Sequence, residues 1–330
     1  MKNEWIKQQK EDRSKTMPVL SFPAVQLLDI SVKQLVSSAD YQVQAMKLIA
    51  DMCPTSVALS MMDLSVEAEA FGSQIRFFDM DVPTVIGSIV SDTDSANSLN
   101  VPKVGQRRDG IYIEAIRQAS KIIHDKPVFA GVIGPFSLAG RLMDMTETMV
   151  NCYEDPELVH IVLKKATEYI TNYILEFKKA GAKGIIMAEP AAGLLSPNLF
   201  EEFSTAYVKE IFNRVKDDNF ILVYHNCGNV VSLASSIMGI DADVYHFGNS
   251  IDIEDMLKVM PNDKLIMGNI DPSAQFKGGS IESITDATTH LLERCNSYPN
   301  FVISSGCDIP PASKWDNINA YFDAILNFYK

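Results

Sequence analysis

Two separate segments of the sequence carry side chains that bind soft metal ions. His225 and Cys227 directly follow the strongly apolar run Phe220–Tyr224. Cys307 follows a second apolar run, Phe301–Ser304, near the C-terminus. A divalent ion such as zinc prefers imidazole nitrogen and thiolate sulfur in a tetrahedral set of ligands, so these side chains predict a zinc site. Three protein ligands leave one position open for substrate, which is the arrangement of catalytic rather than structural zinc sites.

A zinc ion with an open position can activate a thiol substrate. The coordinated thiol loses its proton at neutral pH because the metal stabilises the anion, and the sulfur becomes a nucleophile. The alternative for Cys227 and Cys307 is that they are small buried hydrophobic residues, the commonest fate of a free cysteine. The other cysteines, Cys53, Cys152 and Cys295, lie in or beside helical patterns and are expected to be structural.

Further polar residues end apolar runs and are candidates for the same site. Asp63 is predicted as a catalytic acid or positioning group, although a carboxylate at a strand-to-helix turn can also cap the helix. His246 is predicted as a proton donor or a partner of a metal ligand, with a hydrogen-bonded core histidine as the alternative. Asn269 and Asp271 are predicted to contact the substrate, although Asp271 can equally fix its own Asp-Pro turn.

Two adjacent arginines, Arg107 and Arg108, lie in a long polar stretch from Ser91 to Asp109. A guanidinium group binds an anionic oxygen group through two parallel hydrogen bonds. The pair is therefore predicted to hold an anionic acceptor such as a sulfonate or a carboxylate. The alternative is a solvated lid.

A repeated pattern of short apolar runs and longer amphipathic stretches must position these residues. The clearest helical pattern starts at Asp155-Pro156 and ends at Lys178-Lys179-Ala180-Gly181. Alternating strands and helices predict a parallel sheet, and eight units favour a closed (β/α)8 TIM barrel over an open doubly wound sheet. In such barrels the active site lies at the carboxyl ends of the strands, where the candidate residues stand. The runs, with the weakest given last, are Thr55–Met62, Val128–Ile133, Gly184–Ala188, Phe220–Tyr224, Asp243–His246, Lys264–Met267, Phe301–Ser304 and Val82–Ile86.

The composition fits one barrel and argues against several classes of partner. The chain has 330 residues, of which 47% are hydrophobic and 22% charged, as in globular proteins. A net charge of −13 gives no support for nucleic acid or an anionic membrane surface as partner. No apolar run approaches the roughly 20 residues of a membrane span, and the polar start is not typical of a signal peptide, so a cytoplasmic location is expected. Motifs for ATP hydrolysis, dinucleotide binding and serine hydrolysis are absent.

Several ordered segments resemble the zinc-dependent methyltransferase branch of the uroporphyrinogen decarboxylase superfamily, whose best-known members are the methylcobamide:coenzyme M methyltransferases. The resemblance extends from about Arg13 to the C-terminus. It implies one barrel domain over residues 1–330, of which about 1–54 is an N-terminal helical extension. The segments are Asp63–Gly72, Gly134–Gly140, Glu189–Pro197, His225–Asn229, Gly268–Pro272 and Ser305–Pro310.

The resemblance also implies a reaction and its partners. His225, Cys227 and Cys307 fall where those enzymes bind Zn²⁺, and the metal activates an acceptor thiol. The thiol then takes a methyl group from a methylated corrinoid, a cobalamin-type cofactor, carried on a separate small corrinoid-binding protein. The acceptor is left open among coenzyme M, another thiol and a folate, and the oligomeric state between monomer and homodimer.

Departures from the family patterns bear on two alternatives. True decarboxylases carry an Arg-Gln-Ala-Gly-Arg-type motif near the N-terminus, which the matching residues Arg13–Val19 lack. Asp63 matches their catalytic aspartate, so uroporphyrinogen decarboxylation stays an alternative, as does a barrel that binds a corrinoid or tetrapyrrole without turnover. The methyltransferase branch usually has Asp-Pro where this chain has Glu189-Pro190. Glu189 is predicted as a catalytic carboxylate, either as a displaceable fourth metal ligand or as a hydrogen-bond partner of a ligating histidine.

Overall fold

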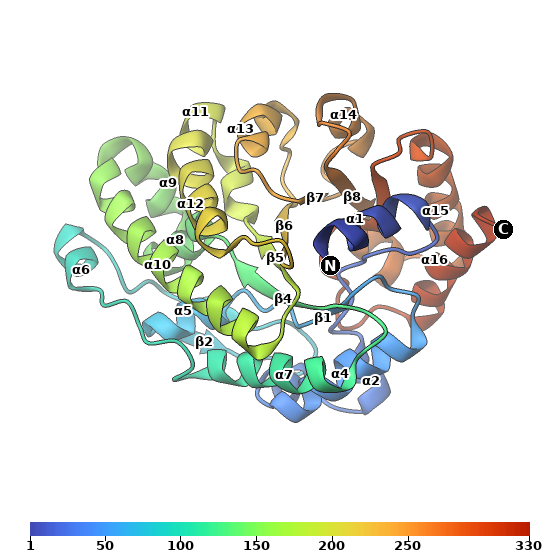
Figure 1. The fold of residues 1–330 in the computed structure, drawn as a ribbon. Coiled ribbons are helices and arrows are strands. Elements are labelled where there is room, and N and C mark those ends of the chain that lie inside the picture. Colours follow the sequence, from blue (N-terminus) through green and yellow to red (C-terminus); the bar gives the residue numbers. More distant parts are fainter.

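Seven parallel strands form the central sheet, and each overlaps one of the apolar runs seen in the sequence (Figure 1). The computed structural model describes residues 1–330. Every residue of the inner strands β5 and β6 is buried, as expected for parallel strands covered on both faces. In order across the sheet, the strands are β1 (Ala58–Leu59), β4 (Val128–Ile133), β5 (Gly184–Ala188), β6 (Ile221–Asn226), β7 (Val244–Phe247), β8 (Leu265–Ile270) and β9 (Phe301–Ser305).

The sheet curls into the predicted TIM barrel, but its eighth position is not filled by the run Val82–Ile86. Within that run, β3 (Thr84–Ile86) pairs antiparallel with β2 (Gln74–Arg76) in a separate two-stranded sheet. All three residues of β3 are at least partly accessible, whereas a barrel strand must be buried on both faces. The prediction of a barrel strand there was therefore wrong.

Residues 16–19 lie between β1 and β9 instead. Thr16 forms a parallel bridge with Thr55, just before β1. On the other side, the main-chain nitrogen of Val19 donates to Ser305 Oγ at 2.9 Å. This short segment, which belongs to the predicted helical extension, therefore closes the barrel with few main-chain hydrogen bonds.

Helices surround the barrel, and their ends follow local capping signals. Asp155 Oδ1 accepts from the nitrogen of Leu158 at 3.2 Å at the start of the long helix that the sequence predicted, and Gly181 ends it with φ of 110°. The α-helices are α1 (Lys2–Glu11), α2 (Ala24–Leu28), α3 (Val32–Val36), α4 (Ala39–Met52), α5 (Val66–Phe71), α6 (Thr93–Ser98), α7 (Arg108–Ile122), α8 (Pro135–Met143), α9 (Met145–Glu154), α10 (Pro156–Ala180), α11 (Pro197–Phe200), α12 (Ala206–Val215), α13 (Ala234–Met238), α14 (Ile253–Val259), α15 (Ile281–Cys295) and α16 (Trp315–Phe328). Shorter 3₁₀ and π turns are η1 (Pro190–Leu194), η2 (Glu201–Thr205), η3 (Val231–Leu233) and η4 (Pro272–Lys277).

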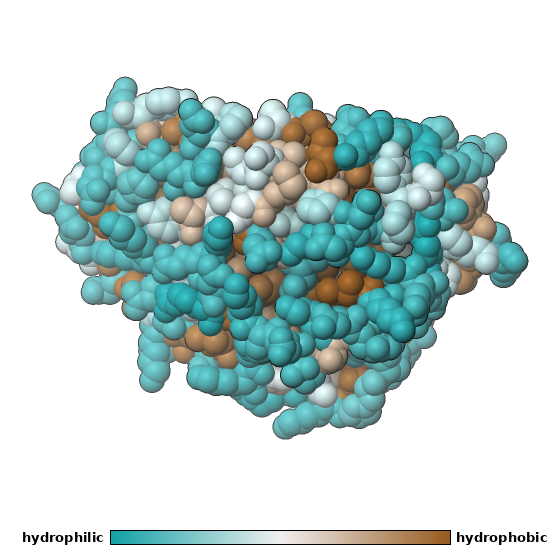
Figure 2. All heavy atoms as spheres, turned by 45° about the horizontal axis from the view of Figure 1, so that its top comes forward, coloured by the Kyte–Doolittle hydropathy of each residue, from teal (hydrophilic) through white to brown (hydrophobic).

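The N-terminal helix α1 covers the amino ends of the strands, where Figure 1 shows it in dark blue across the barrel. Its Trp5 is 4% exposed, and its ring packs in a tilted arrangement against Phe129 with the ring centroids 5.6 Å apart. Trp5 Nε1 donates to the main-chain oxygen of Ser56 at 3.2 Å. Because α1 covers this end, the opening to the barrel interior lies at the carboxyl ends of the strands. No helix combines the length and the apolar character that crossing a membrane requires. Hydrophilic side chains cover most of the face seen in Figure 2, and hydrophobic ones form small separate patches.

Candidate metal centre

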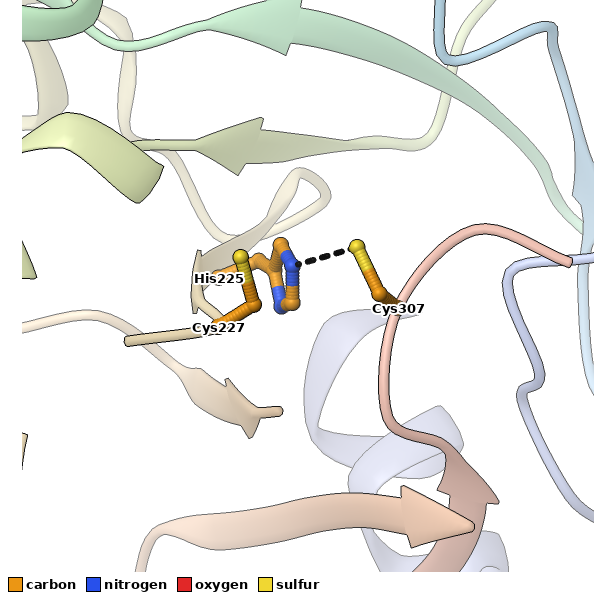
Figure 3. Close-up of side chains that lie close together, drawn as sticks. All are labelled: His225, Cys227 and Cys307. Carbon is orange, nitrogen blue, oxygen red and sulfur yellow. Dashed lines mark hydrogen bonds between the residues drawn. The ribbon is translucent and has the colours of Figure 1, made fainter. Parts of the chain in front are cut away.

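Three potential metal ligands meet at the carboxyl ends of β6 and β9. His225 belongs to β6, Cys227 follows it directly, and Cys307 lies just beyond β9. One ligand atom from each lies within 4.8 Å of the others, and Cys307 Sγ is 3.6 Å from His225 Nε2 (Figure 3). Ligands of a tetrahedral zinc ion lie roughly 3.5–4 Å apart, given Zn–S of about 2.3 Å and Zn–N of about 2.0–2.1 Å. The donor set and its spacing therefore fit zinc.

Glycines allow the loops that carry the two cysteines to approach their neighbours. A Cβ at Gly248, after β7, would lie 2.5 Å from Cα of Cys227. A Cβ at Gly306 would lie 2.8 Å from the main-chain nitrogen of Asn249. Both approaches are closer than a side chain permits, so the ligand positions depend on these glycines.

Cys227 differs from the three cysteines outside the cluster in the direction of its pKa shift. The hydrogen bond between the sulfur atoms of Cys227 and Cys307, with a second from His225, lowers the pKa of the Cys227 thiol although burial opposes the shift. Burial raises the pKa of the Cys53, Cys152 and Cys295 thiols to about 11. A thiolate is therefore favoured at Cys227, whereas the same hydrogen bond, with burial, raises the pKa of the Cys307 thiol well above its ordinary value.

Two further candidates lie against the cluster. The ring of His246 meets that of His225 edge to face, with the two Nδ1 atoms 2.8 Å apart, and burial lowers the pKa of His246 well below its ordinary value. Asp308 directly follows Cys307 in the chain. Its buried Oδ1 atom has no hydrogen-bond partner, and the residue lines the same cavity as Cys307. Burial raises the pKa of Asp308 well above its ordinary value, so its carboxyl group is neutral unless a cation is bound beside it.

The carboxylate of Glu189 binds the start of α8 rather than any of the three potential ligands. Its Oε1 and Oε2 accept from the main-chain nitrogens of Phe136 at 2.7 Å and Ser137 at 2.9 Å, in the first turn of α8. Burial raises its pKa to about 7, and these hydrogen bonds oppose the shift. Both oxygens are occupied, so neither predicted contact, with the metal or with a ligating histidine, is present. The geometry supports a structural role at the helix N-terminus.

The carboxylate of Asp63 also has all its partners within the protein. It forms a buried ion pair with Arg108, and it also accepts from Ser65 Oγ at 2.6 Å and Tyr112 Oη at 3.0 Å. Arg108 donates in addition from Nε to Glu69 at 2.5 Å. The carboxylate predicted as a catalytic acid and one of the arginines predicted to bind an anion therefore neutralise each other inside the protein.

The remaining predicted substrate contacts also have partners within the chain. Arg107 donates to the main-chain oxygen of Glu69 at 3.1 Å. Asn269 donates to the oxygens of Gly248 and Ile251, each at 2.9 Å. Asp271 accepts from the nitrogens of Ser273 and Ala274, both at 2.8 Å, so it fixes its own turn at the start of η4. None of these residues lines the cavity at the metal ligands.

A neighbouring carboxylate, Glu67, has an unusual environment. Glu67 belongs to α5 and is 1% exposed. Its Oε1 accepts from the main-chain nitrogen of Ile133, in β4, at 3.0 Å, and its Oε2 has no hydrogen-bond partner. Burial raises its pKa to about 8, against the effect of this hydrogen bond. The neutral form of Glu67 is therefore favoured at pH 7.

We expect the free energy of unfolding of Glu67→Gln, relative to that of the wild type, to increase as the pH rises. The folded protein holds a proton on Glu67 up to about pH 8, whereas the unfolded chain releases it near 4.5, so the wild type loses stability across that interval. Glutamine does not titrate, and the difference should grow by roughly 1.4 kcal/mol for each pKa unit crossed. Urea unfolding of both proteins at about pH 5, 7 and 9 measures it. A difference that is the same at all three values would contradict a neutral Glu67.

Two adjoining cavities lie at the mouth of the barrel. The first, of about 60 Å³, is lined by His225, Cys227 and Cys307. The second, of about 460 Å³, shares Leu64 and Pro190 with the first as wall residues. Leu64 and Pro190 therefore lie between the space at His225, Cys227 and Cys307 and the larger cavity.

Comparison with known proteins identifies relatives of two activities. Residues 13–328 match the family model described as uroporphyrinogen decarboxylase. The methylcobamide:CoM methyltransferase of Methanosarcina acetivorans is 26% identical over 270 residues, which cover 81% of this chain and 78% of that protein. The uroporphyrinogen decarboxylase of Thermodesulfovibrio yellowstonii is 25% identical over 299 residues, covering 88% and 84%. A solved methyltransferase from Methanosarcina mazei shares the fold, with a TM-score of 0.87 at 22% identity over 97% and 95% of the two chains.

Proposed function

The chain belongs to the uroporphyrinogen decarboxylase family, and within that family we propose that it is a zinc-dependent methyltransferase. The methyl donor is a methylated corrinoid on a small partner protein, and the acceptor is a thiol. The observation that carries this proposal is the meeting of His225, Cys227 and Cys307 at the barrel mouth. Similarity to methylcobamide:CoM methyltransferases supports it.

Each part of the mouth has a role in this reaction. A zinc ion held by His225, Cys227 and Cys307 would lower the pKa of an acceptor thiol so that its sulfur can attack a methyl group at neutral pH. The small cavity, of about 60 Å³, is lined by all three of these side chains, so an acceptor sulfur that enters it lies beside them. Apolar side chains such as Val19, Met62 and Leu64 line it and limit access of water to the reacting sulfur.

The small number of free arginines at the barrel mouth argues against the decarboxylase alternative. Uroporphyrinogen carries several carboxylates, which need several cationic partners. Arg107 and Arg108 have partners within the protein, and the larger cavity contributes one arginine, Arg141. A single free guanidinium suits an acceptor with one anionic group.

We expect Arg141→Met to raise KM for acceptors that carry a carboxylate or sulfonate by roughly 10–100-fold, the equivalent of one charged hydrogen-bonded contact. Neutral thiols of the same length should be used as well as by the wild type. The measurement is the KM of an anionic and a neutral thiol for each protein. Arg107→Met, which alters an arginine outside both cavities, is the matched control. If Arg107→Met rather than Arg141→Met shows the charge-dependent effect, the original sequence prediction holds instead.

The test of the function is methyl transfer by the zinc-loaded protein from methylcobalamin to a panel of thiols. Formation of the methyl thioether, detected by mass spectrometry, is expected, and loss of transfer on removal of the metal by a chelator should be reversed by added zinc. Metal-independent turnover of uroporphyrinogen without thioether formation would establish the decarboxylase. Binding of a corrinoid with neither reaction would establish the non-catalytic barrel.

A further inference from the structure

Hydrogen bonds continue from His225 through the barrel wall to the N-terminal segment. His225 Nδ1 lies 2.8 Å from His246 Nδ1, and His246 Nε2 lies 2.8 Å from Ser304 Oγ. Ser304 Oγ donates to the main-chain oxygen of Met17 at 2.7 Å. His246 and Ser304 are each 0% exposed, so solvent does not supply alternative partners.

The direction of each hydrogen bond follows from the last one. A carbonyl oxygen can only accept, so the single hydroxyl hydrogen of Ser304 is directed to Met17. Ser304 Oγ must then accept from His246, which places a hydrogen on His246 Nε2. In the neutral ring this leaves a lone pair on His246 Nδ1, which accepts from His225 Nδ1.

A second contact assigns the same hydrogen independently. His225 Nδ1 also lies 3.2 Å from the main-chain oxygen of His246, which can only accept. A lone pair on Nδ1 would face this oxygen and be repelled by it. Both contacts therefore put the hydrogen of His225 on Nδ1 and the lone pair on Nε2, the atom that lies 3.6 Å from Cys307 Sγ.

We propose that Ser304 and His246 are positioning residues that hold His225 in the one tautomer able to bind the metal. This inference rests on the proposed zinc function. In a metal site the partner of the second imidazole nitrogen commonly fixes both the tautomer and the ring orientation of the ligand. Here the final acceptor belongs to residues 16–19, so the segment that closes the barrel also orients a metal ligand.

The first test compares zinc affinity in two neighbouring serine variants. Ser304→Ala removes the acceptor of His246 and is expected to raise the Kd for zinc by about 10–100-fold, the range typical for the hydrogen-bond partners of metal ligands. Ser305→Ala is the matched control. Ser305 is also 0% exposed on β9, and its side chain also bonds the N-terminal segment, through Val19, but that side chain hydrogen-bonds to neither histidine. Competition with a chromophoric chelator measures both. An equal change in the two variants would overturn the proposal.

The second test reads the tautomers directly and needs no variant. Ring ¹⁵N chemical shifts of the metal-free wild type should show hydrogen on His225 Nδ1 and His246 Nε2. The opposite assignment at His225 would overturn the proposal, even where Ser304→Ala fails to fold. A wild-type protein that takes up no zinc would instead refute the proposed function, and the tautomers would still be readable.

Discussion

Cys307→Ala is expected to lose its zinc and with it methyl transfer to any thiol. The variant leaves two protein ligands, His225 and Cys227, where catalytic zinc sites have three. The loss of activity should exceed the roughly 10–100-fold seen when only a hydrogen-bond partner of a ligand is removed. Elemental analysis gives the zinc content, and thioether formation from methylcobalamin gives the activity.

The matched control for this variant is Cys295→Ala. Cys295 is buried at the end of α15, and burial raises the pKa of its thiol to about 11, so it is not suited to bind metal. Its removal creates a small cavity and should leave both zinc and activity in place. If Cys307→Ala retains one zinc per chain and transfers methyl groups at the wild-type rate, the assignment of the metal centre is wrong.

The ligand cluster could be predicted because residues that directly follow the strands of a barrel all lie at the same end of it. His225 and Cys307 are separated by 82 positions, yet both follow buried strands, and the strand ends of a barrel converge. Two ligand types at two strand ends were therefore sufficient to expect one cluster. His246 was expected beside it for the same reason, and its ring does contact His225.

Residues at other strand ends could not be assigned in this way, because a strand end fixes the position of a side chain but not its direction. Glu189 and Asp63 both end buried strands or runs, but Glu189 turns to the first turn of α8 and Asp63 to Arg108. The direction in which such a carboxylate points depends on nearby hydrogen-bond donors, and these come from loops and helix ends. Arg141 could not be recognised from the sequence as a substrate-binding residue, because a basic residue is common in the last turn of a helix.

The eighth strand position was missed for a different reason. Sequence patterns identify strands by apolar, β-branched runs, and Val82–Ile86 matched that pattern better than residues 16–19. The short N-terminal segment is held by a single parallel bridge and by side chains such as Ser304 and Ser305. These contacts are specific to the tertiary structure and leave no periodic pattern.

The buried ion pair of Asp63 and Arg108 gives the second large expected effect. We expect Asp63→Asn to destabilise the fold by roughly 3–5 kcal/mol, because Arg108 is then left largely buried with Glu69 as its remaining acidic partner. The Asp63 side chain is 0% exposed and that of Arg108 5%, so water cannot compensate. Glu69→Gln, which alters the more accessible partner with 22% exposure, should cost about 0–1 kcal/mol. Chemical unfolding of the three proteins measures these differences.

A double variant separates a structural Asp63 from a catalytic one. Asp63→Leu combined with Arg108→Met replaces both charges by apolar side chains, and such replacements of a buried pair are often neutral or stabilising. We expect it to recover most of the stability lost in Asp63→Asn, to bind zinc and to transfer methyl groups. A stable, zinc-bound double variant without activity would show that the carboxylate takes part in catalysis, as in the decarboxylase alternative. Because every oxygen of Asp63 already has a partner inside the protein, the geometry favours recovery.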